Sequence, residues 1–320
     1  MRIGIVGAGM AGLSCAAPLT ASGHHVQLFD KARGPGGRMA TRRIETPLGT
    51  AAFDHGAQYF TARDPGFKAQ VAAWARQGVV EEWTVPKGQV WVGTPAMSSV
   101  VKAMAASQHV QWECQIVGMH YKARRWSLKS ATEQFDDFDV IALAIPAEQA
   151  TPFLSLHDFG MARQSISAPT QPCWTAMFAF DERLPTHEDI IHDERIISWA
   201  TRNSSKPGRS GPESWVVQAS PAWSQEHLEA PAPVVAAALL KELGDSLGMV
   251  LPTPVVGTAH RWRFAMSAGS GEGALWNPAL KLGVCGDWLL GPRVECAWLS
   301  GQALAQHIID SEAKENTAPA

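Results

Sequence analysis

The sequence lacks several features that mark particular classes of protein. Its 27 lysines and arginines are balanced by 30 aspartates and glutamates, so there is no basic excess to attract nucleic acid or an anionic membrane surface. No uninterrupted apolar segment approaches the roughly 20 residues that span a bilayer. We therefore expect no nucleic-acid partner and no membrane partner. At 320 residues, the chain is long enough to bury a large core.

Closely spaced cysteines are also absent. The five cysteines are an odd number, and no two of them form the CxxC pair that is typical of metal and redox sites. Their positions are Cys15, Cys114, Cys173, Cys285 and Cys296. We expect reduced thiols, no metal site and a cytoplasmic protein.

A glycine-rich segment, GAGMAG at residues 7–12, lies near the N-terminus. The apolar run Arg2–Val6 precedes the turn, a helical stretch follows it, and a second apolar run ends at Phe29. Short apolar runs of this kind are typical of buried parallel strands. The segment therefore predicts a strand–helix–strand unit, with glycines where the first strand turns into the helix.

Each glycine of this turn has its own expected role. Gly7 allows the tight turn, Gly9 lets the backbone approach a pyrophosphate, and Gly12 allows the helix to pack closely on the strand. Asp30 closes the second strand at the distance expected for a carboxylate that accepts ribose hydroxyl bonds. The alternative is a glycine turn without a ligand. The strand, the helix and the terminal acid together favour a dinucleotide site.

The next segment bears on which dinucleotide binds. Residues 31–39 read KARGPGGRM, and the longer stretch Lys31–Pro47 is too irregular for an element, so we expect a ligand-facing loop. Arg38 directly follows paired glycines, where a guanidinium can bind the pyrophosphate bidentately. The alternative is a solvated surface charge. A second pyrophosphate contact favours FAD over NAD.

The rest of the chain alternates between helical and strand patterns. Apolar spacing predicts helices that begin after Asp64-Pro65, after a Thr94-Pro95 cap, near Val234 and near Val294. Strand patterns predict a hairpin over Val79–Val92 with its turn at Lys87-Gly88, a meander over Val110–Lys129 that turns near Ala123–Arg125, and strands at Val140–Ile145 and Leu282–Cys285. Residues 173–266 predict an antiparallel lobe with one helix that ends at Leu247. We expect the closing helix to end near Ile309 and the polar tail beyond Asp310 to be disordered.

Several motifs together resemble the flavin amine oxidase superfamily, and its renalase branch in particular. They are Asp30-Lys31, the GGRM run at residues 36–39, DHGAQY at residues 54–59, Pro95 with Ser98-Ser99, Arg261-Trp262-Arg263 and Cys285-Gly286-Asp287. Their order and spacing cover nearly the whole chain. The resemblance implies an α/β fold with a Rossmann-type FAD-binding domain and a mostly antiparallel α+β substrate domain, as in amine oxidases and p-hydroxybenzoate hydroxylase. The expected FAD-binding domain comprises 1–52, 106–155 and 276–320, and the expected substrate domain comprises 53–105 and 156–275.

The resemblance also implies noncovalently bound FAD. The expected cofactor-binding residues are Gly7, Gly9, Ala11, Gly12, Asp30, Lys31, Gly37, Arg38, His55, Gly56, Ala57, Ile116, Gly286, Asp287 and Val294. Ile116 would pack on adenine, although a plain strand core residue is an equal alternative. A covalent flavin link at Cys285 or Cys296 is the alternative to noncovalent binding.

Two of these assignments also have a physical basis in the sequence. Asp287 follows a predicted parallel strand, at the end where α/β folds bind ligands, and its carboxylate can accept bonds from ribityl hydroxyls. The alternative is a turn or helix-capping aspartate. The helix that begins near Val294 would direct its positive end at the flavin N1 and C2 carbonyl.

The sequence also discriminates between two reactions. Amine oxidases typically frame a neutral amine with aromatic walls and a lysine-held water, yet this chain has only two tyrosines, and Lys241 is the only lysine between Gly208 and Leu280. A dihydronicotinamide needs no general base, because its ring nitrogen expels the hydride. Resemblance to renalases implies that 2-dihydro and 6-dihydro isomers of NAD(P)H are oxidised to NAD(P)⁺ while O₂ becomes H₂O₂. An amine oxidase and a non-catalytic dinucleotide-binding regulator are the alternatives.

We expect this dinucleotide substrate to be bound without any protein group acting as base. The expected substrate-binding residues are Ala57, Gln58, Tyr59, Phe60, Thr61, Pro95, Trp288 and Arg293. Tyr59 and Phe60 can stack on a flat nicotinamide ring. Arg293 can hold a carboxamide, a phosphate or flavin O2, with a surface arginine as the alternative.

Overall fold

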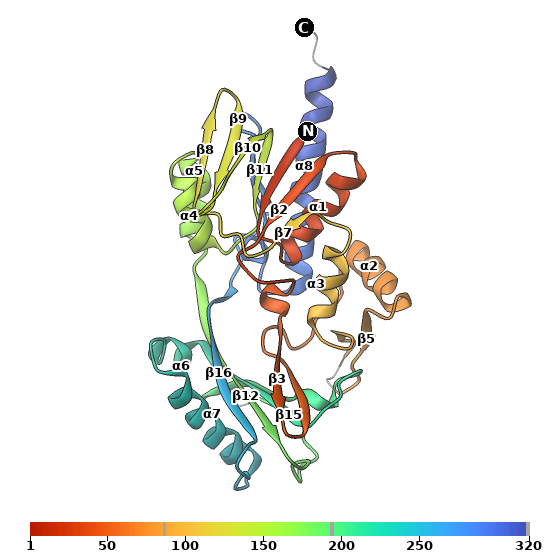
Figure 1. The fold of residues 1–320 in the computed structure, drawn as a ribbon, viewed down its shortest axis with the longest axis vertical. Coiled ribbons are helices and arrows are strands. Elements are labelled where there is room, and N and C mark those ends of the chain that lie inside the picture. The colour runs from red at the N-terminus through yellow and green to blue at the C-terminus, as the bar shows by residue number, and fades with distance from the viewer. Residues whose placement is uncertain (86–87, 193–194, 318–320) are drawn as a thin grey trace. The chain divides into compact units, whose positions relative to one another are not determined.

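The computed structural model describes residues 1–85, 88–192 and 195–317 (Figure 1). Its contacts divide the chain into two compact units. The first unit comprises Met1–Gly37, Val101–Thr170 and Ser267–Ala320, and the second comprises Arg38–Val100 and Gln171–Met266. Within the described residues, no helix combines the length and the apolar character needed to cross a bilayer.

A six-stranded sheet organises the first unit. Its strand order is β17-β18-β11-β1-β2-β7, and β17 alone runs antiparallel to its neighbour. The strands are β1 (Arg2–Val6), β2 (His25–Phe29), β7 (Val110–Gln111), β11 (Val140–Leu143), β17 (Leu275–Asn277) and β18 (Leu282–Val284). The central strands are apolar because both faces of the sheet are covered. The predicted parallel sheet and its strand–helix–strand start are confirmed.

Two helices of the first unit pack closely on each other. They are α1 (Met10–Ala21) and α8 (Val294–Thr317). Gly301 of α8 lies so near α1 that a Cβ on it would be 2.0 Å from Ser14 Oγ and 2.2 Å from Ala11 O. Ser14 in turn donates its hydroxyl to Trp298 O of α8 at 2.9 Å. Small residues on both helices therefore set the distance between them.

The helix α8 is longer than the sequence pattern predicts. It continues to Thr317, so the expected disorder beyond Asp310 is wrong for residues 311–317, and residues 318–320 lie outside the described range. Side chains of the sheet hold the extra turns, because Trp276 Nε1 donates to Ser311 Oγ at 2.9 Å and Lys281 pairs with Glu315 at 2.7 Å. Polar composition alone misses such contacts with residues distant in sequence.

A smaller sheet and a helix pair complete the first unit. They are β8 (Gly118–Lys122), β9 (Arg125–Lys129), β10 (Gln134–Phe138), α4 (Ala147–Ser155) and α5 (Phe159–Ile166). The predicted turn is confirmed, since Ala123 and Arg124 have φ of +49° and +62° between β8 and β9. Trp126 and Phe138 bury their rings beneath this sheet with Leu143 of β11.

The second unit is built on a five-stranded sheet in the order β13-β14-β15-β12-β16. These strands are β12 (Thr170–Phe180), β13 (Ile190–Ile191), β14 (Ile197–Arg202), β15 (Glu213–Ala219) and β16 (Val256–Ser267). The second unit also contains the helices α6 (Pro221–Glu226) and α7 (Ala232–Leu247). Val235, Leu239 and Leu243 of α7 share a hydrophobic core with Trp174 and Trp215 of the sheet. The pairs β13–β14, β14–β15 and β15–β12 are antiparallel, which confirms the predicted antiparallel lobe and its helix.

The remaining elements of the second unit are two hairpins and one helix. They are β3 (Thr41–Thr46), β4 (Gly49–Asp54), β5 (Val80–Glu82), β6 (Trp91–Gly93) and α2 (Pro65–Arg76). The helix α3 (Ser98–Ala105) is divided between the two units after Val100. Asp64 caps α2 by accepting from Gly66 N and Phe67 N, as its sequence predicts. The hairpin over Val79–Val92 is confirmed by β5 and β6, while Lys87 of its predicted turn lies outside the described residues.

Two local predictions are wrong. The expected loop Lys31–Pro47 contains β3, because residues 41–46 pair along their whole length with β4, which begins only two residues further on. Thr94-Pro95 does not cap α3, which begins at Ser98; their peptide bond is cis.

The contact-based units also differ from the expected domain limits. Residues 38–52 group with the second unit, because β3 pairs with β4 and β4 packs on β15. Residues 156–170 group with the first unit, because α5 packs on α4 and places Met161 and Ala162 in the core of that unit.

Replacing Gly301 tests the close approach of α1 and α8. Gly301→Ala should lower the free energy of unfolding by about 2 kcal/mol or more, because the added methyl group meets backbone atoms that cannot move away. Gly118→Ala is the control, since its Cβ would lie 3.8 Å from the nearest atom. Urea unfolding followed by fluorescence measures both variants, and equal stabilities would contradict the packing described above.

Candidate functional site

The structure distributes the predicted site residues over both units. The first unit holds Gly7, Gly9, Ala11, Gly12, Asp30, Lys31, Gly37, Ile116, Gly286, Asp287, Trp288, Arg293 and Val294. The second unit holds Arg38, His55, Gly56, Ala57, Gln58, Tyr59, Phe60, Thr61 and Pro95.

The glycine turn joins β1 to α1 as the sequence predicts. Gly7 has φ of +103°, and a Cβ on it would lie 2.4 Å from Ala144 O. A Cβ on Gly12 would lie 1.9 Å from Gly7 O, so both positions require glycine. By contrast, a Cβ on Gly9 would meet nothing within 4 Å, and Gly9 begins α1 without any side-chain cap. Open space beside an uncapped helix N-terminus fits a pyrophosphate group.

Asp30 supports this turn as well as closing β2. Its two carboxylate oxygens accept from Ala8 N and Ala32 N, each at 2.8 Å. The first bond fixes the backbone of the glycine turn, a role that sequence reasoning did not assign. Each oxygen keeps a second lone pair, so the carboxylate can still accept a ribose hydroxyl. Lys31 beside it is exposed.

The motif Cys285-Gly286-Asp287 lies between the end of β18 and the start of α8. Asp287 is buried, and α8 begins at Val294 as predicted. Arg293 pairs with Glu295 at 2.7 Å, and the Glu295 side chain is only 1% exposed. The Arg293 side chain is 41% exposed, so it reaches solvent while the ion pair with Glu295 holds its guanidinium.

Two residues of the first unit do not fit their predicted roles. Trp288 is buried in the hydrophobic core and donates its indole N–H to Ile145 O at 3.2 Å, which contradicts a substrate-lining role. Ile116 belongs to the same core cluster as Val6 and Phe29, which favours the core alternative over adenine contact. Both side chains are apolar and equally compatible with a core or a ligand wall, so sequence alone could not decide.

In the second unit, the segment Asp54–Tyr59 is held against the backbone of Arg38. A Cβ on Gly56 would lie 2.0 Å from Arg38 O, and Ala57 N donates to the same oxygen at 2.8 Å. Gly56 O accepts from Gln218 Nε2 at 2.8 Å. Arg38 itself donates from Nη1 to Ala265 O at 3.1 Å. The predicted pyrophosphate-binding arginine and the DHGAQY motif therefore form one structural element.

The predicted substrate segment Ala57–Thr61 divides into two groups of side chains. Ala57, Tyr59 and Thr61 are half-buried, and the Tyr59 ring lies 5.2 Å from that of Trp199. Phe60 instead packs in the interior with its ring 6.0 Å from Phe67, so it cannot stack on a substrate as expected. Gln58 also points inward and is buried, whereas Pro95 is exposed.

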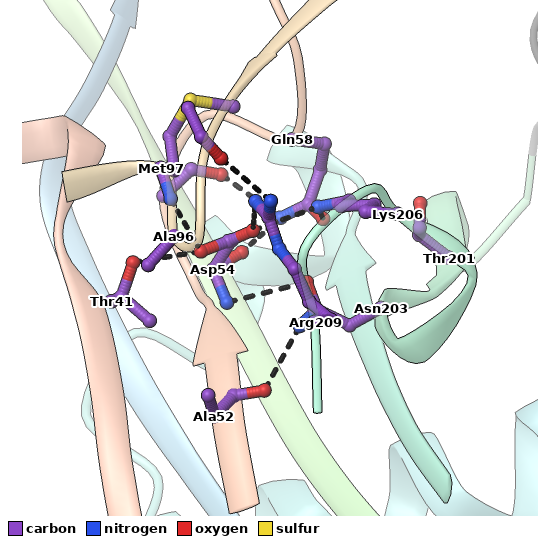
Figure 2. A network of polar contacts seen from close by, with 12 residues as sticks. Thr41, Ala52, Asp54, Gln58, Ala96, Met97, Thr201, Asn203, Lys206 and Arg209 are labelled. Carbon is purple, nitrogen blue, oxygen red and sulfur yellow. Dashed lines mark hydrogen bonds and ion pairs between the residues drawn. The ribbon is translucent and has the colours of Figure 1, made fainter. Parts of the chain in front are cut away.

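A buried polar network surrounds Asp54 at the end of β4 (Figure 2). Asp54 Oδ1 accepts from Thr41 Oγ1 at 2.7 Å and from Met97 N at 3.0 Å. Asp54 Oδ2 faces two cations, Arg209 and Lys206, with Lys206 Nζ at 3.4 Å. We call these five residues and Gln58 the Asp54 network.

The charges of this network determine its protonation. Burial alone would raise the pKa of Asp54, but Lys206 and Arg209 hold that pKa well below its usual range. Burial lowers the pKa of Lys206 to about 8, although Asp54 opposes that shift. At neutral pH the network therefore contains one carboxylate and two cations.

Sequence reasoning missed Lys206 and Arg209. Both lie in the polar segment Ser204–Gly211, whose composition is typical of a turn, and Lys206 precedes the range from Gly208 to Leu280 in which Lys241 is the only lysine. The turn docks on β4 because Asn203 Nδ2 donates to Ala52 O at 2.9 Å. Two cations in one short turn were the available signal, because a carboxylate buried elsewhere needs them.

A second cluster joins two histidines and a tryptophan. His55 stacks on Trp262 with 5.1 Å between ring centroids and an interplanar angle of 29°, and the His260 ring lies 5.0 Å from His55. Trp262 Nε1 donates to His55 O at 2.8 Å. Burial lowers the pKa of both histidines to about 4, with Arg42 adding to the effect. Both rings are therefore neutral at pH 7.

These histidines predict loss of stability in mild acid. Their folded pKa values lie below the unfolded value, so the unfolded chain binds more protons between pH 6.5 and 4, and stability falls as pH drops through that window. After allowance for solvent screening, we expect the pair to contribute on the order of 2 kcal/mol. His260→Asn should flatten this part of the profile in urea unfolding at pH 7 and 4.5. Parallel profiles for the variant and the wild type would show that the histidines do not cause the loss.

Comparison with known proteins places these features in a family. Residues 5–74 match the NAD(P)-binding Rossmann-like domain, and residues 80–309 match the family described as flavin containing amine oxidoreductase. Renalase from Mus musculus is 25% identical over 300 residues, which cover 84% of this chain and 86% of the mouse protein.

Solved structures show the same fold. A putative protoporphyrinogen oxidase from Exiguobacterium sp. 255-15 superposes with a TM-score of 0.75 at 13% identity, over 96% of this chain and 98% of the other. Cyclohexylamine oxidase from Brevibacterium oxydans IH-35A gives a TM-score of 0.71 at 13% identity, over 98% and 99%. Because the family match spans most of the chain and includes the segment that carries Lys206, Arg209 and Asp287, the protein belongs to the flavin containing amine oxidoreductase family and is a renalase-like, flavin-dependent oxidoreductase.

Proposed function

We propose that the protein is an oxidase that converts the 2-dihydro and 6-dihydro isomers of NAD(P)H into NAD(P)⁺ and reduces O₂ to H₂O₂. The observation that carries this proposal is the similarity to a renalase over 84% of the chain, which includes the DHGAQY motif. The isomers lose a hydride without prior proton removal, because the ring nitrogen supplies the electron pair. Bound FAD would supply the hydride acceptor and the route for two electrons to O₂.

The described residues fit FAD at several positions. The glycine turn and the uncapped start of α1 would bind the pyrophosphate, and the Asp30 carboxylate would accept ribose hydroxyls. Arg38 would make the second pyrophosphate contact. Asp287 and the first turn of α8 would face the ribityl chain and the flavin ring, where the helix N-terminus favours negative charge.

We further propose that FAD is held without a covalent bond. Cys285 is fully buried and hydrogen-bonds Cys15, and burial raises the pKa of the Cys296 thiol. A buried thiol is a poor nucleophile. Acid precipitation should therefore release all of the flavin into the supernatant, and yellow colour that stays with the protein would contradict noncovalent binding.

For the substrate, we propose contacts from Ala57, Tyr59, Thr61, Pro95 and Arg293. Tyr59 offers a half-buried ring beside Trp199, and Arg293 offers an exposed cation for a phosphate or a carboxamide. Substrate oxidation would then depend on orientation, because a dihydronicotinamide needs no base. The neutral His55–His260 pair and the engaged Lys206 are consistent with that requirement.

An amine oxidase is the second candidate, and one observation favours it. The chain does possess a buried lysine, Lys206, although sequence reasoning did not find it. Its amino group, however, contacts Gln58 Oε1 at 3.1 Å and Asp54 Oδ2 at 3.4 Å, and the side chain is fully buried. A lysine held in this way is less suited to positioning a water beside a substrate.

Anaerobic reduction distinguishes the two reactions. The purified protein should be yellow, and NADH isomers generated by borohydride should bleach its flavin, because hydride leaves the isomers without a base. Ordinary amines should leave the spectrum unchanged. Bleaching by an amine but not by the isomers would overturn the proposed function in favour of the second candidate.

Two substitutions test the proposed FAD contacts. Asp30→Ala and Arg38→Ala should each weaken FAD binding by roughly 10- to 100-fold, because each removes charge-assisted hydrogen bonds. Asp245→Ala and Arg183→Ala are matched controls, since these side chains are more than half exposed. Titration of the apoprotein with FAD measures the effect. Wild-type affinity in both test variants would remove Asp30 and Arg38 from the cofactor site.

A further inference from the structure

The Asp54 network contains two cations, Lys206 and Arg209, for one carboxylate. Arg209 already hydrogen-bonds Asp54 Oδ2, while Thr41 and Met97 N satisfy Oδ1. Arg209 also donates to Gly93 O at 2.6 Å and to Pro207 O at 2.7 Å, so it anchors its own turn to the end of β6. One hydrogen-bonded cation and both Oδ1 donors would therefore remain on the carboxylate without Lys206.

Lys206 is nevertheless costly to bury. Its side chain is fully inaccessible, and besides Asp54 it contacts Gln58 Oε1 and the ring of Trp83, whose centroid is 5.7 Å from Nζ. Burial of an ammonium opposes folding unless its bonds compensate for lost hydration. A second buried cation beside one carboxylate points to a role in addition to charge compensation.

That role is visible in the contacts of Gln58. Its amide oxygen accepts from Lys206, which leaves Nε2 to donate to Asp54 O at 2.6 Å and to Gly56 O at 3.0 Å. A cation can face only the oxygen of the amide, so Lys206 sets the orientation in which Gln58 bonds both carbonyls. Gly56 and Ala57 then lie against Arg38 O.

We propose that Lys206 is a positioning residue: acting through Gln58, it fixes the backbone of Gly56–Tyr59, the segment assigned above to flavin and substrate contact. The inference rests on the proposed function only for its catalytic consequence. The positioning itself is a property of the second unit, in which all these residues lie.

The first experiment measures positioning without any substrate. In the holoenzyme, Lys206→Met should increase hydrogen exchange of the Gly56–Tyr59 amides about 10-fold or more, because Gln58 loses its orienting partner. Amides of β12 and β15 should exchange as in the wild type, which separates a local effect from global destabilisation. Lys241→Met, at a 77% exposed side chain, is the matched control and should change the exchange of neither region. Unchanged exchange at Gly56–Tyr59 in Lys206→Met would overturn the proposal, whatever the substrate proves to be.

The second experiment measures the consequence for catalysis. Lys206→Met should lower kcat for the dihydronicotinamide isomers roughly 10- to 100-fold, with a much smaller change in KM, because misplacement of the segment affects orientation. Introduced into Gln58→Leu, the same substitution should lower kcat less than about 2-fold further, since both residues act as one unit. Additive effects would show that Lys206 does not act through Gln58.

The dependence of the rate on pH separates positioning from a purely structural role. Burial lowers the pKa of the Lys206 amino group to about 8. The charged groups that act on it are Asp54, which raises this pKa, and Arg209, which lowers it. The wild-type rate should fall as pH rises through this value, because the neutral amine polarises Gln58 less, and Lys206→Met should lack this alkaline limb. An alkaline limb that persists in Lys206→Met would contradict the assignment.

Discussion

The buried carboxylate of Asp54 is the constraint on which the second unit depends. A charge at that depth is tolerated only with full compensation, and the compensation comes from three separate places in the chain: Thr41 on β3, Met97 before α3, and the turn that carries Lys206 and Arg209. Satisfying one carboxylate therefore brings these segments together and fixes where β4 ends. The Asp54–Tyr59 segment starts at that point, so its conformation follows from the same set of bonds.

The glycine turn plays the corresponding part in the first unit. Close packing at Gly7 and Gly12 permits no side chain, and Asp30 then ties the backbone of the turn to the end of β2. The result is an open helix N-terminus whose donors have no side-chain cap. The two units thus present different chemistry: one offers oriented backbone donors, and the other offers a rigid segment stabilised by buried charge.

Much of this could be predicted from local pattern. The glycine turn, the Asp64 cap, the Ala123–Arg124 turn and the start of α8 depend on residues adjacent in sequence, and all were predicted. Two failures are local, since β3 pairs with β4 across only two residues and Phe60 packs on nearby Phe67. The others depend on partners distant in sequence: Trp276 and Lys281 order the end of α8, and Trp288 is buried in a core that includes Val6 and Phe29. Lys206 was missed for the same reason, because its partner Asp54 lies 152 positions away.

Family membership establishes a flavin-dependent oxidoreductase, and the reaction we propose for it depends on orientation more than on proton transfer. The lysine is engaged, the paired histidines are neutral, and the segment proposed to meet the substrate is rigidly supported. A product analysis tests this account most directly. Incubation of the FAD-containing protein with the 2-dihydro or 6-dihydro isomer of NADH in air should yield NAD⁺ and H₂O₂ in equimolar amounts, without any other added substrate. Consumption of an amine with release of an aldehyde, and no NAD⁺ from either isomer, would contradict it.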